Sequence, residues 1–124
     1  MSQALVFPGQ GSQAVGMGKA LAENFAVARE VFAEVDDALN QKLSKVMWEG
    51  TEEELGATEN TQPAIMAVSV AAFRVMQKEA GLDIAHQLCV AGHSLGEYSA
   101  LCAAGSLTLA DCAKLLRIRG SAMQ

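Results

Sequence analysis

Residues 88–101 have the residue types and spacing of a nucleophilic serine site. A short apolar run at residues 88–91 precedes Gly-His-Ser-Leu-Gly at residues 92–96, and residues typical of a helix follow. A serine on a sharp turn between strand and helix is exposed, so a base and a substrate both reach its hydroxyl. Gly92 and Gly96 let the two backbones pass close together. The pattern predicts that Ser94 is a nucleophile in acyl chemistry; the alternative is a βα turn whose serine only caps the helix.

A second glycine-rich turn, at residues 8–13, follows the short apolar run at residues 4–7. Residues 9–14 match a variant of the dinucleotide fingerprint, which requires an acidic residue at the end of a second strand about 20 positions later. Residues 27–39 instead have apolar residues at helical spacing, so this interpretation fails. A P-loop also fails, because Lys19 is followed by alanine. There remains a loop with free backbone N–H groups at a strand end, as an oxyanion hole requires.

A serine nucleophile needs a base, and the sequence has two histidines, His86 and His93. His93 directly precedes Ser94, and adjacent side chains leave a sharp turn in different directions, so we expect it to line the site rather than to take the proton. His86 precedes the predicted strand, about five strand residues or more from Ser94. In enzymes with this turn the histidine follows the serine. None follows Ser94 here, which indicates part of an enzyme.

Helices are predicted to surround the two turns. The stripe in residues 27–39 predicts one helix, and residues 42–48 predict a short second one. Thr51 and the acidic residues after it form a capping box that begins another turn.

A longer helix is predicted for residues 64–80, with Thr61 as its cap and Pro63 near its first position. It is apolar on nearly all sides and should be buried. Thr108 caps the last helix. Two recognisable strands are too few for a stable sheet, so we expect the long helix to lack cover within this chain.

Two polar residues fall on elements that pack inward. Arg119 shares a face of the last helix with apolar residues. An arginine there pairs with a carboxylate of the protein, extends to solvent, or binds a substrate carboxylate through its planar fork, and the pattern leaves these alternatives open. Gln62, at the N-terminus of the long helix, either faces a site or is a simple cap.

The composition favours one domain of helices packed on a small sheet. Of the 124 residues, 51% are hydrophobic, and the net charge of −5 without a basic run argues against nucleic-acid binding. No targeting segment is evident, and the longest apolar stretch, residues 64–73, is too short to span a bilayer. We therefore expect a cytoplasmic protein. Cys89, Cys102 and Cys112 are expected to be buried thiols, neither metal ligands nor disulfide partners.

Four segments form a set, at residues 6–13, 61–64, 92–100 and 119–124. They read Val-Phe-Pro-Gly-Gln-Gly-Ser-Gln, Thr-Gln-Pro-Ala, Gly-His-Ser-Leu-Gly-Glu-Tyr-Ser-Ala and Arg-Gly-x-x-Met-Gln. Together they resemble malonyl-CoA:acyl carrier protein transacylase, the enzyme that loads malonyl units for bacterial type II fatty acid synthesis. The resemblance implies the N-terminal part of an α/β-hydrolase-like large subdomain, a parallel sheet flanked by helices, into which a ferredoxin-like small subdomain is inserted.

The resemblance also implies a ping-pong reaction. A malonyl group passes from coenzyme A through an ester on Ser94 to the phosphopantetheine thiol of acyl carrier protein. The backbone N–H groups of Gln10 and Leu95 would form the oxyanion hole. Coenzyme A thioester is then a substrate, and no metal or permanently bound cofactor is implied.

The same resemblance assigns Arg119 to the malonyl carboxylate and places Gln62 in the pocket, with His93 among the substrate-binding residues. Arg119 is the match rather than Arg117, because the family arginine directly precedes a glycine.

Family members are more than twice as long, and their catalytic histidine lies in the part absent here. We therefore expect residues 1–124 to be an incomplete N-terminal portion of the catalytic domain, without the small subdomain and inactive alone. Its partners would be malonyl-CoA, acyl carrier protein and the C-terminal remainder. One alternative is a serine hydrolase or thioesterase, against which Arg119 argues. The other is an inactive interaction fragment, which the missing base favours for the isolated polypeptide.

Overall fold

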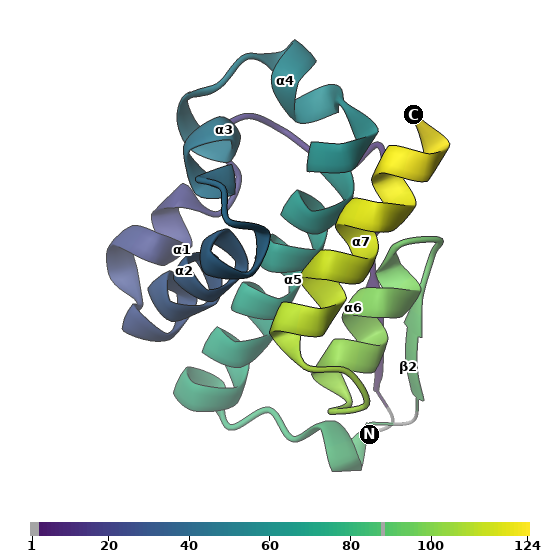
Figure 1. Ribbon diagram of the computed structural model, residues 1–124. Helices are drawn as coiled ribbons and strands as arrows, with labels where there is room; N and C mark the ends of the chain where they lie inside the picture. Colours follow the sequence, from purple (N-terminus) through teal and green to yellow (C-terminus); the bar gives the residue numbers. More distant parts are fainter. Residues whose placement is uncertain (1–2, 88) are drawn as a thin grey trace.

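Helices form most of the structure, and two short strands lie at one side of it. The computed structural model describes residues 3–87 and 89–124. Figure 1 shows α5 at the centre of the helices, with α7 alongside it and β2 at the outer edge. The elements in chain order are β1 (Ala4–Phe7), α1 (Lys19–Asn24), α2 (Ala26–Leu39), α3 (Leu43–Glu49), α4 (Glu52–Gly56), α5 (Thr58–Ala80), a 3-10 turn (Ile84–His86), β2 (Cys89–Gly92), α6 (Gly96–Ala103) and α7 (Leu109–Met123).

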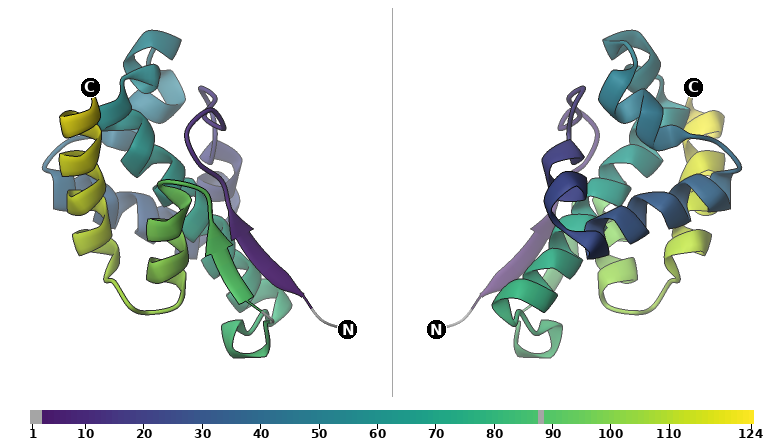
Figure 2. Two further views of the ribbon diagram at one scale, coloured as in Figure 1. Left: turned by 90° about the vertical axis from the view of Figure 1, so that its right-hand side faces the viewer. Right: turned by 90° about the vertical axis from the view of Figure 1, so that its left-hand side faces the viewer.

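The two strands pair in parallel, with Ala4 opposite Cys89 and Phe7 opposite Gly92. A parallel pair needs a crossover connection, which here is the whole helical region from α1 to α5. Figure 2 shows the strands side by side next to the helices. Their carboxyl ends lie at the same edge, so the loops after Phe7 and Gly92 meet there.

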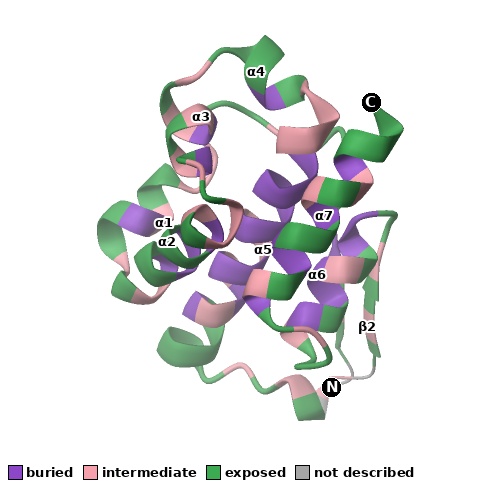
Figure 3. Ribbon diagram, viewed as in Figure 1, coloured by how far each residue is buried: buried purple, intermediate pink, exposed green. Residues whose placement is uncertain are grey.

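Helix α5 is covered mainly by other helices, and Phe73 near its C-terminal end packs edge-on against Phe7 of β1. Its buried residues pack against α2, α6 and α7, and the buried stretches of α5 and α7 lie together in Figure 3. Met66 and Leu116 are completely buried, and burial of a side chain of this size contributes about 1.5–3 kcal/mol. The expectation that this helix lacks cover within the chain is therefore wrong, because two long helices lie along it.

Two helix caps are as the sequence predicts. Thr51 forms a capping box with Glu54 at the start of α4. The Thr108 hydroxyl accepts a hydrogen bond of 3.1 Å from the Asp111 backbone N–H at the start of α7.

The predicted start of the long helix is wrong. Helix α5 begins at Thr58, and Thr61 lies inside it, completely buried. The Thr61 hydroxyl donates to the carbonyls of Leu55 and Ala57, which close helix α4. The threonine thus serves the C-terminal end of the preceding helix, because α4 and α5 are joined without an intervening loop.

Only two of the three cysteines are buried. Cys102 and Cys112 lie in the core, whereas Cys89, the first residue of β2, is exposed; all three are free thiols. The expectation of burial is wrong for Cys89, because no element in the described part of the chain covers that end of the strand.

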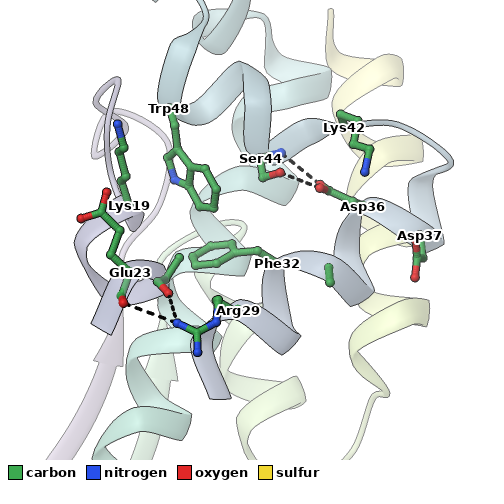
Figure 4. A pocket seen from close by; sticks show the side chains of 11 residues that line it. Lys19, Glu23, Arg29, Phe32, Asp36, Asp37, Lys42, Ser44 and Trp48 are labelled. Carbon is green, nitrogen blue, oxygen red and sulfur yellow. Dashed lines mark hydrogen bonds between the residues drawn. The ribbon is translucent and has the colours of Figure 1, made fainter. Parts of the chain in front are cut away.

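The loop after β1 is anchored on helix α3. The Gly16 N–H donates to the Met47 carbonyl (2.7 Å), and the Trp48 indole N–H donates to the Met17 carbonyl (2.9 Å). Trp48 in turn packs edge-on against Phe32 of α2, with ring centroids 5.2 Å apart (Figure 4). The two rings line a hollow of about 470 Å³ between α1, α2 and α3. None of the candidate site residues lines this hollow, so its aromatic wall serves the site only by holding the loop.

The predicted fold class, α/β with a parallel sheet flanked by helices, is confirmed. Over residues 3–87 and 89–124 the strands are β1 and β2, and no antiparallel subdomain is found there. Within those same ranges, no helix has the length and apolar character to cross a bilayer.

The open edge of β1 predicts that residues 1–124 self-associate when purified alone. Val6 is 73% exposed on this edge strand, beside an apolar groove that Met76 and Phe73 of α5 help to line. Unpaired N–H and C=O groups next to apolar side chains recruit further strands. Sedimentation velocity over a tenfold concentration range should show oligomers that grow with concentration, and Val6→Lys should shift the distribution towards monomer.

Leu115→Lys is the matched control, because Leu115 is also exposed and apolar but lies on helix α7, away from the strands. A monomer at every concentration, or equal effects of the two lysine variants, would contradict association through the strand edge.

Candidate active site

Ser94 occupies a strained turn between β2 and α6. Its φ is +57°, a left-handed conformation that costs a residue other than glycine about 1–3 kcal/mol. The turn is closed by hydrogen bonds from the Gly96 N–H to the His93 carbonyl (3.0 Å) and from the Glu97 N–H to the Ser94 carbonyl (3.1 Å). Ser94 is exposed. The strand, the turn and the helix are as predicted from residues 89–101, whereas Leu88 lies outside the described residues.

Two glycines allow the backbones around this turn to touch. A Cβ on Gly92 would lie 2.0 Å from the carbonyl carbon of Gly96, and a Cβ on Gly96 would lie 2.3 Å from the Phe7 carbonyl oxygen. Both distances are far below van der Waals contact. Glycine at these positions therefore brings the end of β1, the end of β2 and the start of α6 together.

The glycine-rich loop after β1 lies against the Ser94 turn. The His93 N–H donates to the Phe7 carbonyl (3.2 Å), and a Cβ on Gly9 would lie 2.5 Å from the His93 carbonyl oxygen. This contact places Gln10 next to the turn.

The backbone N–H groups of Gln10 and Leu95 at this junction, like those of Gly9 and Ser94, have no acceptor among the described residues. The Leu95 side chain is completely buried, so only its backbone is available to a ligand. The Gln10 side chain points elsewhere and donates to the Thr58 hydroxyl (3.4 Å). Free N–H groups on two adjoining loops are one requirement of a site that stabilises a negatively charged oxygen.

Arg119 of α7 joins the serine to the start of α5. Its Nη2 donates to the Ser94 hydroxyl oxygen (3.1 Å), and its Nη1 donates to Oε1 of Gln62 (2.7 Å). Gln62 is completely buried, and its Nε2 donates to the Met123 sulfur (3.3 Å). The amide is therefore oriented with its oxygen towards the guanidinium. Arg119 thus contacts both Ser94 and Gln62 and links them.

The charge of Arg119 is not neutralised by a carboxylate within residues 3–87 and 89–124. Two of the alternatives left open by the sequence are thereby decided: Arg119 neither forms an ion pair in this part of the chain nor extends freely into solvent. A half-buried guanidinium with hydrogen bonds only to neutral groups retains the capacity to bind an anion.

Arg117, two residues earlier, has a different environment. Its Nη2 donates to Oε1 of Gln41 (2.5 Å), at the end of α2 and away from Ser94. Burial lowers the pKa of the Arg117 guanidinium, and the nearby Glu59 carboxylate partly opposes this shift.

Sequence reasoning missed two contacts of the site. The Tyr98 ring lies under the Arg119 guanidinium, with 5.7 Å between Cζ and the ring centroid. Met123 accepts the hydrogen bond from Gln62. Tyr98 lies in the first turn of α6, four residues after Ser94, and this closeness to the serine in the sequence was the signal that could have identified it.

Neither histidine is shown as a base. His93 is exposed, and its ring Nδ1 lies close to Gly9, 3.0 Å from where a Cβ would stand; it has no hydrogen bond to the serine. The side chain of His86 lies outside the described part of the chain. The described residues hold a serine on a strained turn and an arginine without a carboxylate partner, but they show no base on Ser94.

The sequence matches one protein family and several named relatives. A family model described as acyl transferase domain matches residues 4–124. Malonyl CoA-acyl carrier protein transacylase from Bacillus subtilis is 49% identical over 121 residues, which is 98% of this chain and 30% of that protein. The same-named protein from Salmonella typhimurium is 48% identical, over 98% of this chain and 38% of that protein.

Solved structures agree as well. Acyl-carrier-protein-S-malonyltransferase from Bartonella henselae has a TM-score of 0.96 and 60% identity, covering all of this chain and 40% of that one. A type II PKS acyl-carrier protein in complex with its malonyl-transacylase has a TM-score of 0.93 and 46% identity, covering all of this chain and 39% of that one. The chain thus spans about a third of the length of the curated relatives named above. The match over nearly all of its own length shows that it belongs to the acyl transferase domain family.

Proposed function

We propose that the protein containing residues 1–124 transfers a malonyl group from coenzyme A to acyl carrier protein through an ester on Ser94. The observation that carries the proposal is the pair of hydrogen bonds that Arg119 makes to Ser94 and Gln62. They place a cation within reach of an acyl group attached to the serine. An acyl group that ends in a carboxylate one methylene away from its carbonyl fits this arrangement.

In the first half of the reaction, the Ser94 oxygen attacks the thioester carbonyl carbon and its proton passes to a base. The carbonyl oxygen becomes an oxyanion, which the N–H groups of Gln10 and Leu95 stabilise. The carbon–sulfur bond then breaks, and coenzyme A leaves with the proton as a thiol. In the second half, the phosphopantetheine thiol of the carrier protein attacks the serine ester, and Ser94 recovers its proton.

Arg119 selects the acyl group. Its Nη1 is held by Gln62, and a malonyl carboxylate takes the Nη2 donor that otherwise faces the serine. Gln62 supports this as a neutral acceptor, because a carboxylate at that position would compete with the substrate for the guanidinium. His93 lines the same junction, where its backbone N–H donates to the carbonyl of Phe7, the last residue of β1.

The base that takes the Ser94 proton is not found among the described residues. We propose that residues 1–124 are one portion of a longer catalytic domain whose other portion supplies the base on Ser94. The relatives' names point to acyl carrier protein as the acceptor. The chemistry needs no metal or resident cofactor, because the thioester is already activated, and three free thiols fit a cytoplasmic location.

A serine hydrolase or thioesterase remains the second candidate, because it needs the same turn and the same oxyanion N–H groups. It does not need a cation beside the acyl chain. The position of Arg119 therefore favours transfer of an acid-bearing acyl group.

Brief incubation of the full-length protein with malonyl-CoA should leave a malonyl group on Ser94. Ser94→Ala should abolish both this adduct and turnover, because the exposed hydroxyl on the strained turn is the attacking group. Peptide mapping by mass spectrometry measures the adduct. Malonyl found on the exposed Ser121, or on the completely buried Ser99, would overturn the assignment.

Arg119→Ala should reduce malonyl transfer on the order of a hundredfold or more, because charge-assisted hydrogen bonds to the carboxylate are lost. Acetyl transfer should fall little or rise. The ratio of kcat/KM for malonyl-CoA to that for acetyl-CoA measures the effect.

Arg117→Ala is the matched control, since this arginine contacts Gln41 rather than Ser94, and it should leave the ratio unchanged. Equal losses for both acyl groups in Arg119→Ala would show a structural role for Arg119 instead.

A further inference from the structure

We propose that Tyr98 is a positioning residue for Arg119 and thereby sets how strongly the site prefers an acyl group with a carboxylate. The inference rests on the proposed function and extends it to a residue whose side-chain hydroxyl has no hydrogen bond to any of the described residues. Its basis is the placement of the Tyr98 ring beneath the guanidinium, 5.7 Å from Cζ to the ring centroid. This is within the range in which an aromatic face attracts a cation.

The ring contact differs from the two hydrogen bonds of Arg119 in a way that matters during the reaction. Nη2 donates to the Ser94 oxygen, which becomes esterified, so this bond does not persist through the cycle. Nη1 donates to Gln62, which fixes only one corner of the group. An aromatic face holds the guanidinium without using any of its N–H donors. Tyr98 is thus a second contact that persists, beside the Gln62 hydrogen bond, while Nη2 turns to the substrate carboxylate.

Tyr98 is itself well fixed. It lies in the first turn of α6, and its N–H donates to the Leu95 carbonyl (3.0 Å). Its carbonyl accepts a hydrogen bond from the Cys112 thiol of α7 (3.5 Å). The side chain is half-buried and packs against the main core. The residue therefore ties the helix that begins after Ser94 to the helix that carries Arg119.

A long arginine side chain loses much rotamer freedom when it is held in one place. Without the ring, one lasting hydrogen bond remains to restrain a half-buried guanidinium. We expect the arginine then to sample orientations that do not meet the malonyl carboxylate, which weakens malonyl binding and leaves acetyl binding nearly unaffected.

The test compares substitutions at Tyr98 in the full-length protein. Tyr98→Leu should lower kcat/KM for malonyl-CoA by about three- to thirtyfold, the range that corresponds to a cation–aromatic contact. The loss should appear mainly as a higher KM, because the contact supports ground-state binding of the carboxylate. kcat/KM for acetyl-CoA should change less than twofold. Tyr98→Phe keeps the ring and should retain the selectivity of the original protein.

A fluorinated ring keeps the experiment decisive even if the leucine variant does not fold. Trifluorophenylalanine at position 98 preserves the shape of phenylalanine but weakens the negative face of the ring. It should reduce malonyl selectivity relative to Tyr98→Phe at an unchanged Tm. Equal selectivity for these two aromatic variants, or equal losses for both acyl groups, would overturn the proposal.

Tests in the Arg119→Ala variant distinguish a failure of the proposed function from a failure of the proposed role of Tyr98. There, Tyr98→Leu should have no further effect on the malonyl to acetyl ratio, since the pair acts as a unit. If Arg119→Ala itself leaves the ratio unchanged, the proposed function fails. If Arg119→Ala changes the ratio but the Tyr98 variants do not, only the role of Tyr98 fails.

Discussion

The site depends on the close crossing of three backbone segments at the carboxyl edge of the sheet. Gly92 touches Gly96, and Gly96 touches the carbonyl of Phe7, at distances that leave no room for a Cβ. This contact points the start of α6 at the loop after β1, and it pushes Ser94 outward with φ at +57°. It also brings together the two loops that carry the free N–H groups of Gln10 and Leu95. The proposed nucleophile and the proposed oxyanion donors thus depend on one packing constraint.

The helices supply what the strands cannot. Arg119 and Gln62 come from α7 and α5, which pack along each other, and their hydrogen bond crosses that interface. The loop after β1 is held from the other side by Trp48 of α3. Because the side chains of the site come from several elements, their relative positions depend on how tightly the helices pack against one another. The complete burial of Gln62, Met66 and Leu116 shows how firmly those contacts are packed.

Features set by local sequence patterns were predicted well, whereas contacts between residues far apart in the sequence were not. The turn around Ser94 was predictable because two glycines, a strand and a helix are adjacent in the sequence. The inward phase of Arg119 was predictable from helical spacing. Its partners were not, because the hydrogen bond to Gln62 joins residues 57 positions apart. Thr61 was misassigned since a hydroxyl that accepts from its own helix and one that donates to the preceding helix have the same sequence signature. Tyr98 was overlooked because its ring contact leaves no polar pattern.

The register of the strands has a consequence for the order of folding. Ala4 pairs with Cys89, 85 residues later, so the sheet forms only after a very long loop is closed. Helices α2 and α5 make contacts closer in the sequence, and we expect them to consolidate first. The turn that carries Ser94 completes its packing only when Phe7 arrives beside it. The geometry of the proposed site is therefore among the last features to form. A chain with a native helical core but an unpaired first strand would resemble the folded protein in helix content while lacking the left-handed conformation of Ser94.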